Sequence, residues 1–177
     1  MNQKIKFLRE TLGLTEKEIS SFLNISSYKY ISFEKTATDI PFDILILISR
    51  IFGINIELLL DSKFNNQDLL SELERQGLIG ENNILDKLRR NLLQNNDTKI
   101  TYRSIRKVKN DFQQNIISFI NNLIKDSRMN LLDFAKYMGM DKQGLESILS
   151  KKRFIELDEL KCISEKFNVS VDYIING

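Results

Sequence analysis

The sequence predicts an all-α protein in which two copies of a five-helix domain are joined by a helical middle segment. Three observations support this fold class. Apolar residues recur every three or four positions along most of the chain, which is the period of an amphipathic helix. The 177 residues include one proline and no tryptophan. The two ends of the chain also align without a gap at an offset of 115 residues, as Ile5 with Ile120 and Phe52 with Phe167 illustrate.

The internal repeat defines the expected domain boundaries. It predicts an N-terminal domain over residues 1–61, a connecting segment over 62–114 and a C-terminal domain over 115–177. A chance match between helical segments would not hold one register across several helices and their turns. The identical pairs are Ile5/Ile120, Leu8/Leu123, Ser32/Ser147, Ile40/Ile155, Asp43/Asp158, Leu45/Leu160, Ile48/Ile163, Ser49/Ser164 and Phe52/Phe167.

Local signals place the five helices of the first copy. Thr15 and Glu18 have the spacing of a capping box, in which each residue accepts a hydrogen bond from the backbone of the other. Ser26 is an N-cap residue. Pro41 opens a further helix, and Gly53 ends it. The expected helices cover residues 2–11, 15–23, 27–35, 42–52 and 56–60.

The second copy repeats this order of helices, with Asn130, Asp141 and Ser170 as N-caps. Its expected helices cover residues 115–126, 130–138, 141–150, 157–167 and 170–175. Gly144 interrupts the third of them, at a position where glycine costs a helix about 1 kcal/mol relative to alanine.

The middle segment is expected to hold two short helices, 68–75 and 83–93, and a polar loop, 94–99. From Thr101 a helix runs without a breaker into the second copy. Its apolar stripe either packs within the chain or forms the seam of a homodimer through residues 101–126. The stripe consists of Ile105, Val108, Phe112, Ile116, Phe119 and Leu123. Cations on this helix (Arg103, Arg106, Lys107 and Lys109) either contact DNA backbone or form a solvated face.

Composition argues against an enzyme. The chain has no histidine, the commonest acid–base group and metal ligand near neutral pH. It shows no phosphate-cradling glycine loop and no set of metal ligands, so no cofactor or metal is expected. Its single cysteine, Cys162, follows an apolar helical pattern and reads as a buried structural thiol.

Other features indicate a cytoplasmic protein without a membrane partner. The N-terminal residues do not resemble a signal peptide. The most apolar run, residues 42–60, contains charged side chains and reads as a pair of core helices rather than a membrane span. A single cysteine fits a reducing compartment.

Both copies resemble the Cro/lambda-repressor type of helix-turn-helix domain, the XRE family. In the second copy, Ala135 and Gly139 match the family's small residue in helix two and its turn glycine. In the first copy, residues 33–35 ("FEK") and 52–60 ("FGINIELLL") look like the family. The glutamine that commonly begins helix two is replaced by Glu16 in the first copy and by Leu131 in the second. The resemblance implies two lambda-repressor-like helix-turn-helix domains in one chain.

The resemblance also implies that the third helix of each copy enters the major groove of double-stranded DNA. Carried over residue by residue, the candidate DNA-binding positions are Ser27, Tyr28, Lys29, Ser32 and Lys35 in the first copy, and Lys142, Gln143, Glu146, Ser147, Lys151, Lys152 and Arg153 in the second. Gln143 is suited to adenine and Glu146 to the N4 amino group of cytosine. The cations at 151–153 either hold phosphates or form a solvated loop.

Net charge does not decide the function. The whole chain carries a charge of +2, and neither copy is basic overall. The expected function is a sequence-specific DNA-binding transcriptional regulator, a repressor of bacterial or phage origin. The alternative is a protein-interaction module, such as an antirepressor or an inhibitor of a host nuclease, in which one or both domains dock on a protein. The sequence leaves open which copy binds DNA, which operator or effector it recognises, and its oligomeric state.

Overall fold

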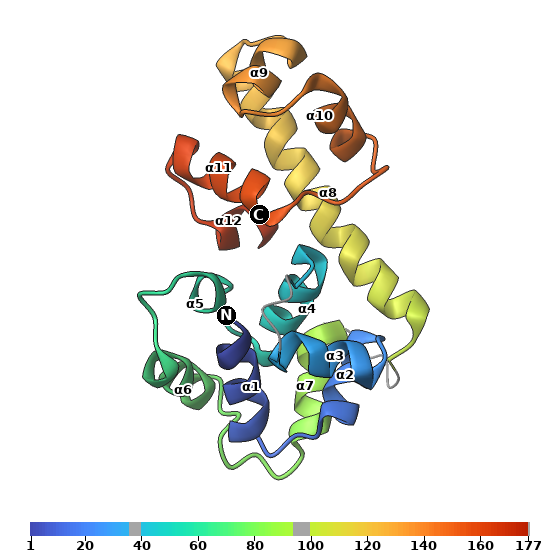
Figure 1. The fold of residues 1–177 in the computed structure, drawn as a ribbon, viewed down its shortest axis with the longest axis vertical. Coiled ribbons are helices and arrows are strands. Elements are labelled where there is room, and N and C mark those ends of the chain that lie inside the picture. Colours follow the sequence, from blue (N-terminus) through green and yellow to red (C-terminus); the bar gives the residue numbers. More distant parts are fainter. Residues whose placement is uncertain (36–39, 94–99, 177) are drawn as a thin grey trace. The chain divides into compact units, whose positions relative to one another are not determined.

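The computed structural model describes residues 1–35, 40–93 and 100–176, and over these residues all regular secondary structure is helical, with no strand (Figure 1). The expected all-α class is therefore confirmed. The helices are α1 (Asn2–Thr11), α2 (Glu16–Leu23), α3 (Ser27–Lys35), α4 (Phe42–Phe52), α5 (Glu57–Leu60), α6 (Asn66–Arg75), α7 (Ile84–Leu93), α8 (Tyr102–Ser127), α9 (Leu131–Tyr137), α10 (Lys142–Leu149), α11 (Leu157–Phe167) and α12 (Val171–Asn176).

The chain forms two compact units, Met1–Val108 and Lys109–Gly177, which we call unit 1 and unit 2. The division falls inside α8. Helix α6 packs on α1, and α7 packs on α4. The helices of the expected connecting segment that precede α8 therefore belong to unit 1. The loop expected at 94–99 lies outside the described residues.

The offset of 115 residues is visible in the helix boundaries and in the backbone. Helices α4 and α11 begin and end at equivalent positions. Residues with positive φ also pair at this offset, namely Gly13 with Arg128 (65° and 55°), Asn24 with Gly139 (53° and 72°), and Gly53 with Asn168 (62° and 51°). These left-handed residues end the preceding helix or turn, so the two copies share their turn geometry as well as their helices.

A side-chain hydrogen bond at the end of α4 and α11 follows the same register. The hydroxyl of Ser49 donates to the carbonyl of Ile54 over 2.8 Å, and the hydroxyl of Ser164 donates to the carbonyl of Val169 over 2.6 Å. Both bonds tie the loop that leaves the helix back to its last turn. This shared serine explains one of the identical pairs in the sequence.

The two copies differ in what covers their fourth helix. Nearly every residue of α4 is buried, including Ile46 and Ile51. At the equivalent positions α11 carries Lys161, which is half-buried, and Lys166, which is exposed. A helix that is apolar all round has to be covered all round. The packing of α7 on α4 supplies part of that cover.

Helix α8 is a single helix of 26 residues, as the absence of a breaker after Thr101 predicts. Four residues of its apolar stripe (Ile105, Val108, Phe112 and Ile116) are buried. Phe119 is half-buried and meets the ring of Tyr173 edge-on, with 6.0 Å between the ring centroids. Most of the stripe is thus covered without a second chain. Over the described residues, none of the helices is long and apolar enough to cross a membrane.

Candidate nucleic-acid interface

In unit 1, helices α2 and α3 form a tight pair joined by a short turn. The capping box at Thr15 is present: the Glu18 carboxylate accepts from the Thr15 N–H over 2.8 Å, and the Glu18 N–H donates to the Thr15 hydroxyl over 3.2 Å. The Thr15 hydroxyl also donates to the Glu18 carboxylate over 2.8 Å, and the two bonds that this carboxylate accepts from Thr15 lower the pKa of Glu18. Asn24 ends α2 in the left-handed conformation. The hydroxyls of Ser20 and Ser27 lie 2.9 Å apart and join the two helices.

The candidate residues of α3 divide into exposed and engaged groups. Tyr28 is 85% exposed, and Lys29 and Lys35 are also exposed. Ser27 is half-buried and bonded to Ser20, while the Ser32 hydroxyl donates to the Lys29 carbonyl over 2.7 Å. The outer face of α3 therefore presents one aromatic ring and two cations.

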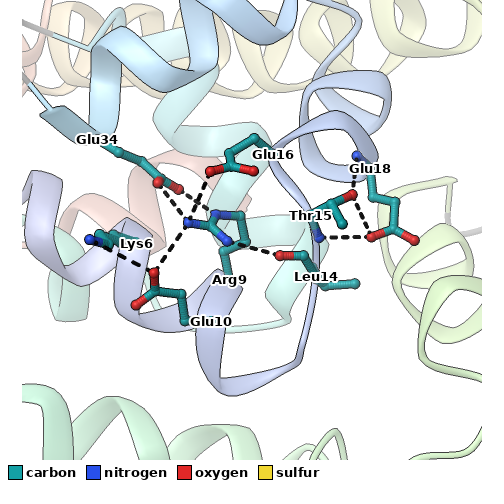
Figure 2. Close-up of polar contacts among 8 residues, drawn as sticks. All are labelled: Lys6, Arg9, Glu10, Leu14, Thr15, Glu16, Glu18 and Glu34. Carbon is teal, nitrogen blue, oxygen red and sulfur yellow. Dashed lines mark hydrogen bonds and ion pairs between the residues drawn. The ribbon is translucent and has the colours of Figure 1, made fainter.

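Beneath α3 lies a buried ion pair that the sequence analysis did not identify (Figure 2). The Arg9 guanidinium donates to both oxygens of Glu34, Nε to Oε1 over 2.7 Å and Nη2 to Oε2 over 2.8 Å. Its Nη1 donates to the carbonyl of Leu14 over 2.9 Å. Arg9 is 7% exposed and Glu34 is 6% exposed. The hydrogen bond to Glu34 raises the pKa of Arg9.

The repeat contained a signal for this pair. At the offset of 115 residues, Arg9 aligns with Ile124 and Glu34 aligns with Leu149. Two opposite charges at positions where the other copy is apolar indicate a pair inside a core, because a single buried charge is costly. Tyr30 is fully buried as well. Burial, followed by the charge of Glu34, raises the pKa of Tyr30, so its phenol stays protonated.

In unit 2, helices α9 and α10 form the equivalent pair. The Asn130 side chain caps α9 by accepting from the Asp133 N–H over 2.9 Å, and Asp141 caps α10 by accepting from the Gly144 N–H over 2.5 Å. Gly139 lies between them with φ of 72°. Ala135 and Leu145 are fully buried. One side of α10 is thus fixed against the core, and the opposite side faces solvent.

Three candidate residues of α10, Gln143, Glu146 and Ser147, line one shallow groove together with Lys152. Lys142, Gln143 and Glu146 are exposed, and the Lys142 ammonium lies 3.3 Å from the Glu146 carboxylate. The groove has a volume of about 650 Å³. Its lining consists of Leu131, Gln143, Glu146, Ser147, Leu149, Ser150 and Lys152. An amide, a carboxylate, a hydroxyl and an ammonium group therefore surround a single recess.

Arg153 is engaged differently from the two lysines before it. Its guanidinium binds Glu159 through two contacts of 2.7 and 2.5 Å, and this pairing raises the pKa of Arg153. Lys151 and Lys152 are exposed. Of the three cations expected to hold phosphates, Arg153 already has a carboxylate partner inside the protein.

Gly144 has a packing reason. A Cβ atom at this position would lie 3.3 Å from Nη2 of Arg153 and 3.3 Å from Oδ1 of Asp141. Both contacts are tighter than most Cβ contacts, so glycine lets the Arg153–Glu159 pair and the Asp141 cap lie close to the helix. The described residues contain no group of three His, Cys, Asp or Glu side chains suited to a metal ion.

Comparison with known proteins identifies no relative. No protein-family model matches the chain, and no significant match was found among curated proteins or solved structures.

Proposed function

We propose that this protein is a sequence-specific DNA-binding regulator, a repressor, in which α2–α3 and α9–α10 act as two helix-turn-helix units of the Cro/lambda-repressor type. The observation that carries the proposal is the exposed side of α10. There Gln143 and Glu146 line one groove together with Lys152, which follows the end of α10. Amide and carboxylate groups discriminate bases in the major groove, and an exposed ammonium suits phosphate.

The side chains on α10 of unit 2 are better suited to hydrogen bonding with bases than those on α3 of unit 1. On α3 the equivalents of Gln143 and Glu146 are Tyr28 and Ile31, which offer contact with thymine methyl groups but little hydrogen bonding to base edges. Lys142 balances the charge of Glu146, which reduces the repulsion between this carboxylate and DNA. We therefore assign base recognition to α10.

A second candidate function follows from Tyr28. An aromatic ring that is 85% exposed on the outer face of α3 is typical of a protein-docking position. In this alternative, unit 1 binds a protein, as an antirepressor or a nuclease inhibitor does, and unit 2 keeps the DNA contact or also docks.

The experiment is a gel-shift titration with the DNA upstream of the coding region, alongside selection from a random duplex library. The regulator is expected to bind one sequence at least about 1,000-fold more tightly than random duplex. Gln143→Ala and Lys152→Glu should weaken this binding by about tenfold or more. Tyr28→Ala, which removes only an apolar contact with DNA, should weaken it far less, and the exposed Lys125→Glu in α8 serves as the charge-matched control.

The absence of any preferred sequence after selection would reject the proposal in favour of docking. Binding that Tyr28→Ala abolishes while Gln143→Ala and Lys152→Glu do not affect it would reject the assignment of base recognition to α10, since this would place the contact on α3.

A further inference from the structure

The first two turns of α8 carry three cations on one side of the helix, Arg103, Arg106 and Lys107, which we call the basic face. All three side chains are exposed. Ile105 and Val108, on the other side, are buried. Because residues three and four apart share one side of a helix, burial of the apolar side holds the basic face toward solvent.

The three cations of the basic face form no ion pair within the described residues, although Asp111 follows Lys107 by four residues in α8. Cations on other helices pair with a carboxylate one turn away. The distance from the side-chain nitrogen to the carboxylate oxygen is 3.8 Å for Lys6 and Glu10, 2.5 Å for Arg75 and Glu72, and 3.3 Å for Lys142 and Glu146. In the part of the chain that the structure describes, no carboxylate pairs with Arg103, Arg106 or Lys107. Like charges three and four residues apart also destabilise a helix. Ion pairs within the described residues therefore do not account for this arrangement.

We infer that the basic face binds the phosphate backbone of duplex DNA, independently of base sequence. The inference rests on the proposed function in taking the same duplex as its partner, and it adds a contact outside both helix pairs. From Arg103 to Lys107 the face extends about 6 Å along the helix axis. One DNA strand presents about two phosphates over that length. The charge and the spacing both fit a polyanion with regularly spaced groups.

An anionic membrane fits this surface less well. A helix that lies on a membrane inserts an apolar side between the lipids. In α8 the apolar side is covered by protein, since Ile105, Val108 and Phe112 are all buried. Tyr102, which is 67% exposed, is the single large hydrophobic residue exposed in the first two turns of this helix. Electrostatic attraction would have to act without insertion.

The test compares the full chain with the variant Arg103→Gln/Arg106→Gln/Lys107→Gln. The binding constant K of each for a random-sequence duplex is measured by fluorescence anisotropy at about 50–200 mM salt, a range that resolves counterion release. If the basic face neutralises the two phosphates that it spans, the slope of log K against log salt should become shallower by about 1.8. The affinity advantage of the native chain should then fall by about 12-fold across this salt range. The melting temperature should not decrease, because the substitution removes repulsion within the helix.

The matched control is Lys63→Gln/Arg90→Gln/Lys125→Gln, which removes the same charge from three exposed positions outside both helix pairs. It should shift the slope far less. Equal slopes for the two variants would overturn the inference, because net charge alone would explain them. Binding to phosphatidylserine vesicles without binding to duplex would overturn it in favour of a membrane. Loss of sequence preference with the slope difference intact would reject only the proposed function.

Discussion

The buried Arg9–Glu34 pair predicts that removing one charge is much worse than removing both. Arg9→Ile would leave the Glu34 carboxylate at 6% exposure without the two hydrogen bonds it now accepts, and the Leu14 carbonyl without its side-chain donor. Breaking a buried ion pair in this way costs about 3–5 kcal/mol. That is a large share of the about 5–15 kcal/mol that stabilises an ordinary domain.

The double substitution Arg9→Ile/Glu34→Leu copies the pair of residues that unit 2 has at the equivalent positions, Ile124 and Leu149. It removes both charges together, and apolar replacement of a buried pair is often neutral or stabilising. We expect the double variant to lose about 1 kcal/mol relative to the native chain, because the Leu14 carbonyl still loses its side-chain donor. Each single variant should lower the melting temperature of unit 1 by at least about 12 °C.

The assay is urea unfolding of the full chain, combined with hydrogen exchange read by mass spectrometry. Exchange in α1 and α3 reports on unit 1, and exchange in α11 provides an internal reference from unit 2. The reasoning is refuted if the double variant is as unstable as either single variant. It is equally refuted if Arg9→Ile costs less than about 1 kcal/mol, since the charge left behind would then be solvated.

Three further predictions concern other contacts. Hydrogen bonds from Thr15 lower the pKa of Glu18, so the stability that this carboxylate adds is present above its unfolded-state pKa and is lost as pH falls through its lower folded-state pKa. In urea titrations, Glu18→Gln should remove this part of the pH dependence of stability. An unchanged pH dependence would contradict the prediction. Arg153→Met should destabilise unit 2 by about 1–2 kcal/mol in chemical denaturation, because it removes the contact with Glu159. The control Lys152→Gln should stay within about 0.5 kcal/mol of the native chain. Equal effects of the two variants would show that the Glu159 contact adds no stability. Ile46→Lys should lower the free energy of unfolding of unit 1 by more than about 4 kcal/mol because it buries an unpaired charge. The opposite change at the equivalent position of unit 2, Lys161→Ile, should leave the stability of that unit nearly unchanged. Similar losses in the two units would mean that the cover over α4 does not explain why α4 is apolar and α11 is not.

The helices themselves could be predicted from the sequence with good accuracy. The expected ranges 42–52 and 157–167 coincide with α4 and α11. These boundaries depend on local chemistry: Pro41 precedes α4, and left-handed residues, Gly53 and Asn168, end both helices. Helix α6 begins two residues before the expected range of 68–75, because its capping box joins Asn65 to Asp68 and lies upstream of the apolar pattern.

The candidate interface was only partly predictable. The exposure of Lys142, Gln143 and Glu146 follows from helical periodicity once Leu145 and Ile148 are assigned to the core. The engagement of Arg153 did not follow, because its partner Glu159 belongs to the next helix. The reason for Gly144 was hidden in the same way, since Arg153 and Asp141 are the groups that approach it.

The sequence by itself determined the helical class, the helix boundaries and the register of the repeat, since caps, turns and apolar periodicity act between near neighbours. Only the tertiary structure decided which charges are free to meet a partner. Arg9 is held by Glu34 inside unit 1 and Arg153 by Glu159 in unit 2, whereas Arg103, Arg106 and Lys107 face solvent. A charged side chain has the same chemistry in all these places. Its availability depends on what packs against it, and residues distant in the sequence decide that.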